Sequence, residues 1–315
     1  MRIKKCLFLV VYAFIFSVSP AWGSAFDSHK DENDGCLKYH HPITSFIEFQ
    51  SINLETQPPS PITIKGKLKL PVRYSKRFEC YLPKKSVPAV VILHGSAGID
   101  FRGDFYARSL NANGIATLEI DMWEARGVKT LADRPSIPIV NLPDAFGALR
   151  FLTEQENIDP EHIGIMGFSW GGVVTMAAAT EFNAARFGGD LRFAAHIAHY
   201  PVCFAYNSAI PGSEFFNLTG APIMIQIGDE DDYDEGAAAC LAVKASLTPE
   251  EQDLLRVRVY KGATHGWDRL QMPTTFIDPF SHLGAGGEVS VVPDVNYAYK
   301  SRRRVVRFFR SHLME

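Results

Sequence analysis

Residues 163–172, which read IGIMGFSWGG, constrain the fold of this chain more than any other stretch. Their first half is an apolar run as long as a buried parallel strand, and an alanine-rich run typical of a helix follows the segment. Between the two lies a G-x-S-x-G sequence centred on Ser169. A serine on so sharp a turn has a strained backbone, and side chains at Gly167 and Gly171 would collide. The segment therefore predicts a nucleophile elbow, which lifts the serine hydroxyl above a sheet at the start of a helix.

Strand-like and helix-like patterns alternate along the rest of the chain. Strands are expected at 89–93, 115–120, 193–199, 223–227 and 257–260, and helices at 101–113, 142–156, 236–246 and 296–313. Such alternation predicts an α/β fold with a mostly parallel sheet covered by helices on both faces. Residues 46–52 and 62–70 alternate polar and apolar side chains, which indicates an antiparallel pair at the edge of that sheet.

The chain has no internal repeat and no low-complexity linker, and 315 residues with 46% hydrophobic content fit one large core. We expect a single domain over residues 24–315. Within it, residues 24–84 form an N-terminal arm with the edge strands, and residues 88–312 form the catalytic core.

The first 23 residues have the pattern of a signal peptide. Arg2, Lys4 and Lys5 give a positive start, Cys6–Val18 is apolar, and Ala21-Trp22-Gly23 offers small residues for cleavage. The apolar run is too short for a comfortable transmembrane helix, so we expect no integral membrane segment after cleavage. The mature protein is expected to be exported, to the periplasm or the medium.

Because an exported protein meets an oxidising environment, its cysteines are candidates for disulfide bonds. The mature chain keeps Cys36, Cys80, Cys203 and Cys240, an even number without C-x-x-C spacing. We favour a Cys203–Cys240 disulfide, because each cysteine follows a core strand near the same edge of the sheet. Cys36–Cys80 would then tie the arm to the body, although the sequence alone leaves three connectivities open.

A serine nucleophile needs a base, and the base needs an orienting acid. Strand 223–227 ends in GDEDD, and strand 257–260 runs into KGATHG, so an acid and His265 follow the serine in the order typical of this architecture. Both turns fall at the carboxyl ends of parallel strands, where such groups gather. We expect His265 to be the base and Asp231 the acid, with Asp232 in reserve. Asp229, Glu230 and Asp234 are expected to be a solvated acidic loop.

Two backbone N–H groups are candidates for an oxyanion hole. The N–H of Trp170 follows the nucleophile at the helix start, and the N–H of Ser96 lies in HGSAG after the strand 89–93. The Trp170 side chain is also a candidate wall of the substrate pocket. We expect loops 121–138 and 204–220 to shape that pocket.

These segments together resemble the dienelactone hydrolase family of the α/β-hydrolases. The resemblance is carried by LHGSAG, IDMWEARGV, DAFGALRFL, GFSWGG, IGDEDDYD and ATHGWDR, in family order over residues 88–312. It implies the α/β-hydrolase fold with eight strands, and hydrolysis of an ester or lactone through an acyl-enzyme. It also implies Asp231 as the acid. The enzymes that name the family have a cysteine nucleophile, whereas Ser169 stands here, so the resemblance favours a serine esterase.

Other patterns are expected to be structural. His196 and His199 lie three residues apart on a strand and face opposite sides, so they do not predict a metal site. The DEDDYDEG segment lacks EF-hand spacing, and no metal or cofactor is expected. The net charge of -3 gives no sign of a nucleic-acid partner. Arg126 is expected either to contact an acidic substrate group or to form a surface salt bridge.

The sequence predicts an enzyme that cleaves a small-molecule ester or lactone. Three alternatives remain open: a serine peptidase or an acyltransferase with the same three residues, and a non-catalytic binding protein on the same scaffold.

Overall fold

The computed structural model of the chain describes residues 41–76, 80–207 and 213–314. Its centre is an eight-stranded sheet in the order β1-β2-β6-β5-β7-β8-β9-β10. The strands are β1 (Ile43–Asn53), β2 (Ser60–Leu70), β5 (Val87–Leu93), β6 (Ala116–Asp121), β7 (Ile158–Phe168), β8 (Ala195–His199), β9 (Ile223–Glu230) and β10 (Leu255–Thr264). The six strands from β6 to β10 are parallel, and the pairs β1–β2 and β2–β6 are antiparallel. The predicted sheet and its antiparallel edge are confirmed.

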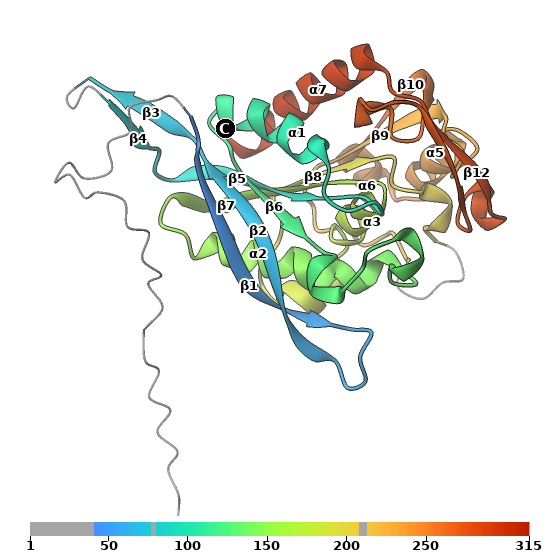
Figure 1. Cartoon of the computed structure of the whole chain (residues 1–315), viewed down its shortest axis with the longest axis horizontal. Coiled ribbons are helices and arrows are strands. Elements are labelled where there is room, and N and C mark those ends of the chain that lie inside the picture. Colours follow the sequence, from blue (N-terminus) through green and yellow to red (C-terminus); the bar gives the residue numbers. More distant parts are fainter. Residues whose placement is uncertain (1–40, 77–79, 208–212, 315) are drawn as a thin grey trace, which may run out of the picture. The chain divides into compact units, whose positions relative to one another are not determined.

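Helices cover the sheet on both faces, as expected from the alternation of strands and helices. They are α1 (Phe101–Ala112), α2 (Leu142–Thr153), α3 (Trp170–Ala177), α4 (Glu181–Asn183), α5 (Ala238–Ala245), α6 (Pro249–Leu254) and α7 (Val295–Leu313). Helices α1 and α7 pack against each other on one face, and α2 lies on the other face with α3 (Figure 1). The architecture is that of an α/β-hydrolase.

Strand β5 shows why these strands read as continuous apolar runs. Each of its seven residues is buried. Val90 and Ile92 point to the core that contains Phe105 of α1, whereas Val91 and Leu93 point to the core beneath α2. Because side chains alternate between the two faces and each face is covered, every position of the strand is apolar.

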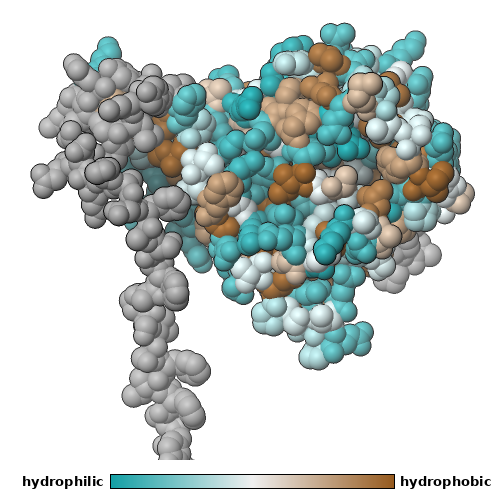
Figure 2. All heavy atoms as spheres, viewed as in Figure 1, coloured by the Kyte–Doolittle hydropathy of each residue, from teal (hydrophilic) through white to brown (hydrophobic). Residues whose placement is uncertain are grey.

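Two small hairpins lie outside the main sheet and were not predicted. One pairs β3 (Val72–Ser75) with β4 (Cys80–Pro83), and the other pairs β11 (Thr274–Asp278) with β12 (Gly287–Val291). Figure 2 shows hydrophobic residues scattered over the visible face rather than gathered in one continuous patch. Among the described residues, no helix is long and apolar enough to cross a membrane. The predicted signal peptide, residues 1–23, lies outside the described residues.

Candidate active site

Ser169 occupies the turn between β7 and α3 in a strained conformation, with φ 50° and ψ −110°. A Cβ atom added to Gly167 would lie 2.1 Å from the carbonyl oxygen of Gly171, and one added to Gly171 would lie 2.6 Å from that of His94. Both distances are far below a van der Waals contact, so only glycine fits on either side of the serine. The expected strand–turn–helix geometry is therefore present.

The structure brings Ser169, His265 and Asp231 together from three strand ends. His265 Nε2 lies 2.9 Å from Ser169 Oγ, and His265 Nδ1 lies 2.8 Å from Asp231 Oδ2. All three side chains are buried. Because the acid holds Nδ1–H, Nε2 faces the serine as an acceptor of its proton. Asp232, the reserve candidate, instead accepts the backbone N–H of Ser290 through its carboxylate.

The two candidate oxyanion donors line one pocket with Ser169. Trp170 is the first residue of α3, so its N–H has no partner within the helix. Ser96 follows β5 in a loop that is held from both sides, because His94 Nδ1 donates to Gly95 O over 2.8 Å and Trp123 Nε1 donates to Ser96 O over 3.1 Å. His94 Nε2 in turn accepts a backbone N–H, and burial lowers the pKa of His94, which keeps it in the neutral form that this pattern needs.

Two tyrosines that sequence reasoning did not single out pack against the His265 ring. The ring centres of Tyr233 and Tyr200 lie 4.4 and 4.7 Å from that of His265. The Tyr233 hydroxyl donates to Asp278 over 2.9 Å, and the Tyr200 hydroxyl donates to the buried Asp268. Tyr200 directly follows β8, and Tyr233 lies in the turn after β9, so both are near strand ends, the positions that predicted the acid and the histidine. This placement was a usable signal for residues that position the ring.

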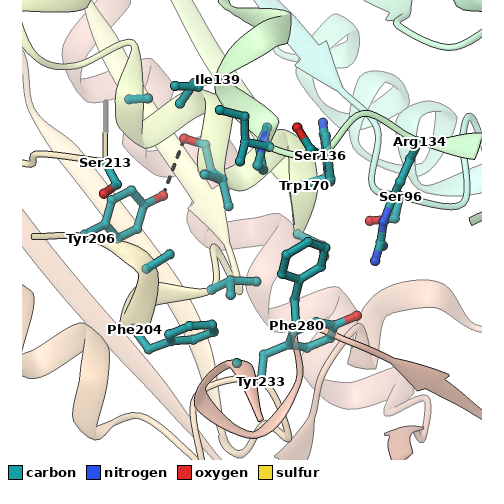
Figure 3. A pocket seen from close by; sticks show the side chains of 18 of the residues that line it. Ser96, Arg134, Ser136, Ile139, Trp170, Phe204, Tyr206, Ser213, Tyr233 and Phe280 are labelled. Atoms are coloured by element: carbon teal, nitrogen blue, oxygen red, sulfur yellow. Dashed lines mark hydrogen bonds between the residues drawn. The ribbon is translucent and has the colours of Figure 1, made fainter. Parts of the chain in front are cut away.

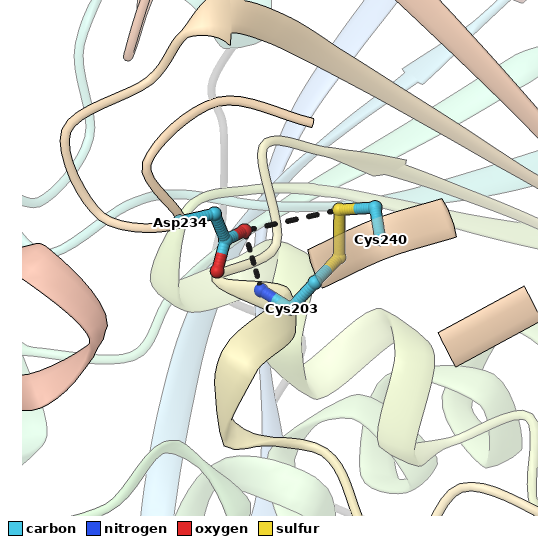
Figure 4. A group of neighbouring side chains, drawn as sticks. All are labelled: Cys203, Asp234 and Cys240. Atoms are coloured by element: carbon cyan, nitrogen blue, oxygen red, sulfur yellow. Dashed lines mark hydrogen bonds between the residues drawn. A yellow bond between two sulfur atoms is a disulfide. The ribbon is translucent and has the colours of Figure 1, made fainter. Parts of the chain in front are cut away.

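The expectation for Asp234 was wrong, because this carboxyl is buried rather than solvated. It accepts the backbone N–H groups of Cys203 and Phe204 over 2.7 and 2.8 Å, beside the Cys203–Cys240 disulfide (Figure 4). Burial, together with the nearby charge of Asp231, raises the pKa of Asp234 to about 7. Asp229 and Glu230 are exposed, as expected.

The disulfide confirms the favoured Cys203–Cys240 pair. The second expected pair, Cys36–Cys80, includes Cys36, which lies outside the described residues. Among the described residues, Cys203, Asp234 and Cys240 place three potential metal-ligand atoms within 4.8 Å of one another. Because the two sulfurs are bonded to each other, no thiolate is present to bind an ion.

Arg126 forms the expected salt bridge, but the pair is buried rather than on the surface. Its guanidinium donates to both carboxylate oxygens of Asp144, over 2.7 and 3.1 Å, and both side chains are almost fully buried. The guanidinium charge is therefore balanced inside the protein. Asn141 bonds the same Asp144 and accepts the indole N–H of Trp170 over 2.9 Å, so this network also fixes the Trp170 side chain.

His196 and His199 point to opposite sides of β8, as predicted. His196 Nδ1 contacts the carbonyl oxygen of Thr175 in α3, whereas the His199 ring packs against Tyr106 of α1. Burial lowers the pKa of each histidine to about 4, so both are neutral at physiological pH.

An apolar pocket of about 330 Å³ opens beside Ser169 (Figure 3). The described parts of the two expected loops contribute to its lining, through residues 134 and 136–138 and through residues 204–206, 213 and 214, and Trp170 forms part of its wall. The lining includes Ile137, Pro138, Ile139, Val173, Ala177, Val202, Phe204, Tyr206 and Phe280. A second pocket of about 290 Å³ also reaches Ser169, and its lining includes His265, Gly266, Thr274, Thr275, Phe276 and Val291. The unpredicted β11–β12 hairpin supplies the last four of these residues.

Several known proteins are similar to this chain in sequence or in structure. The chain is 31% identical over 104 residues to the thiohydrolase aneE of Aspergillus aculeatus, a match that covers 33% of each protein. The structure resembles a putative dipeptidyl aminopeptidase IV from Bacteroides ovatus, with a TM-score of 0.58 and 16% identity over 87% of this chain, which spans only 36% of that chain. It also resembles the dienelactone hydrolase-like promiscuous phosphotriesterase P91 from metagenomic libraries, with a TM-score of 0.56 and 15% identity over 85% of this chain and 98% of that one.

The family of the chain follows from a match of its sequence to a family model. Residues 78–313 match the model of the dienelactone hydrolase family, which is about three quarters of the chain. The chain therefore belongs to the dienelactone hydrolase family.

Proposed function

We propose that the protein is a serine hydrolase that cleaves small-molecule carboxylic esters or lactones through an acyl-enzyme intermediate. One observation carries this proposal: an unbroken chain of contacts runs from Ser169 Oγ through the His265 ring to Asp231, with 2.9 and 2.8 Å between the paired atoms. A serine, a histidine and an acid in this arrangement activate the hydroxyl as a nucleophile. Membership of the family is in keeping with that chemistry.

In the proposed reaction, His265 Nε2 takes the proton of Ser169 while Oγ attacks the acyl carbonyl carbon. The backbone N–H groups of Trp170 and Ser96 stabilise the oxyanion, and Asp231 holds the histidine in the tautomer that accepts the proton. His265 then passes the proton to the leaving alcohol oxygen as the carbon–oxygen bond breaks. Water, activated by the same histidine, releases the carboxylic acid and restores Ser169.

Replacement of the nucleophile tests this proposal. Ser169→Ala is expected to lower kcat for 4-nitrophenyl acetate by 10³-fold or more, because no group remains to form the acyl-enzyme. The matched control is Ser109→Ala on α1, a half-buried serine outside both pockets. Full turnover by Ser169→Ala would contradict the proposal. Burst kinetics on aminoacyl arylamides, or transfer to an added alcohol faster than to water, would favour a peptidase or an acyltransferase instead.

We further propose that the protein works after export, as a mature single-domain enzyme that begins near Ser24. The Cys203–Cys240 disulfide supports this location, because disulfides persist mainly in oxidising compartments.

A further inference from the structure

We propose that the apolar pocket beside Ser169 binds the acyl group of the substrate, and that the enzyme prefers esters of medium-length or aryl-substituted carboxylic acids. This inference rests on the proposed function and adds to it the side on which each half of the ester binds.

The position of His265 separates the two halves of the substrate. The two pockets meet at Ser169 and share Ser96 and Tyr233 as lining residues, but only the second pocket is lined by His265. Since the histidine must protonate the leaving oxygen, the alcohol half lies on its side of the serine. The acyl half, attached to the same carbonyl carbon, therefore binds in the apolar pocket.

The walls of the apolar pocket suit an uncharged chain. Val173 and Ala177 line it from α3, and Figure 3 shows Tyr206 and Ser213 on the side away from Ser96. The Arg134 side chain in the lining is neutralised by Asp278, at 2.8 Å, and lies over the rings of Trp170 and Phe280. A carboxylate in this pocket would lose its hydration without gaining a free cation, whereas methylene and aryl groups gain from burial.

The volume limits the length of the acyl group. At roughly 30 Å³ for each heavy atom, the share of one water molecule in the liquid, 330 Å³ holds roughly ten such atoms. The pocket therefore buries an acyl chain of about six to ten carbons, or a phenylalkanoyl group, and the far end of a palmitoyl chain would extend beyond it. Lengthening the chain strengthens binding through apolar burial until this limit is reached.

A series of 4-nitrophenyl esters from acetate to palmitate tests the inference. We expect kcat/KM of the wild type to rise at least tenfold from acetate to a maximum between hexanoate and decanoate, with no further gain on longer chains. In Ala177→Leu, which extends a side chain into the pocket, the maximum is expected to move at least two carbons shorter, and the ratio of kcat/KM on decanoate to kcat/KM on acetate is expected to fall at least threefold. Ala112→Leu makes the same change on the exposed side of α1 and should leave the profile unchanged.

Two outcomes would overturn the inference. One is a profile that is flat or falls from acetate onward in the wild type. The other is an equal loss on every ester in folded Ala177→Leu, as judged by thermal melting. Either outcome leaves the proposed function standing if acetate is still turned over through Ser169. An absence of turnover on every ester would instead overturn the proposed function, and the inference with it.

Discussion

At the scale of single residues, three aspartates in the turn after β9 have different environments. Asp231 meets His265, Asp232 holds the backbone of β12 at Ser290, and Asp234 is buried beneath the loop after β8. The carboxylates are chemically alike, so only the direction of each side chain decides what it contacts. Asp231 directs one carboxylate oxygen at the histidine, and its other oxygen accepts the N–H of Tyr233.

Removing the charge of Asp231 tests its proposed role. Asp231→Asn is expected to lower kcat for an activated ester by about 10³- to 10⁴-fold, because an amide can hold the histidine in the wrong tautomer. Asp232→Asn changes the neighbouring carboxylate in the same way and should stay within about tenfold of the wild type. Equal losses of kcat in the two variants, measured at saturating substrate, would contradict the role of Asp231 as the acid that orients His265.

At the scale of elements, the site depends on loops that follow strand ends. The turn after β9 is tied to the loop after β8 by the Cys203–Cys240 disulfide and by Asp234, which accepts two backbone N–H groups of that loop. The loop after β6 is tied to α2 through Arg126 and Asp144. These buried polar contacts position Phe204 and Trp170 in the pocket wall.

The buried Asp234 makes the stability of this region depend on pH. Its pKa is about 7 in the folded protein against an ordinary value of 3.8, so between these values the folded state binds more protons than the unfolded state. The free energy of unfolding therefore falls as pH rises from about 4 to 7, by up to about 1.4 kcal/mol for each pH unit. Asp234→Asn is expected to flatten this slope in urea unfolding with the disulfides intact.

The exposed Glu230 provides the control for this prediction. Glu230→Gln removes a carboxylate from the same turn without a buried charge and should keep the slope of the wild type. Parallel slopes for Asp234→Asn and the wild type would show that Asp234 does not cause the pH dependence of stability.

At the scale of the whole molecule, one parallel sheet gathers groups that lie far apart in sequence. Ser169 and His265 are 96 positions apart, and Asp231 and His265 are 34 positions apart. Each follows a strand of the same sheet, and parallel strands end at one edge. That rule is why the strand pattern and the glycines around Ser169 predicted the sheet and placed Ser169, His265 and the acidic turn at one edge of it. The choice of Asp231 over Asp232 also rested on the family resemblance.

The parts that could not be predicted depend on contacts between loops. Asp234 was expected in solvent, and the expected salt bridge of Arg126 was placed at the surface, because a short polar segment does not show which other loop will cover it. The β11–β12 hairpin was missed as well, although residues 274–277 and 288–291 are rich in β-branched side chains. This hairpin lines the pocket beside His265. The sequence therefore predicted the candidate catalytic side chains but not the shape of the pocket around them.

The most direct test of the central claim is to label the folded protein with a fluorophosphonate probe and map the labelled peptide by mass spectrometry. Such a probe reacts with a serine that has been activated as a nucleophile. We expect one labelled site, Ser169, in the wild type and no labelling in folded His265→Ala. Labelling at a different serine, or none on the folded wild type, would contradict the claim that Ser169 is an activated nucleophile.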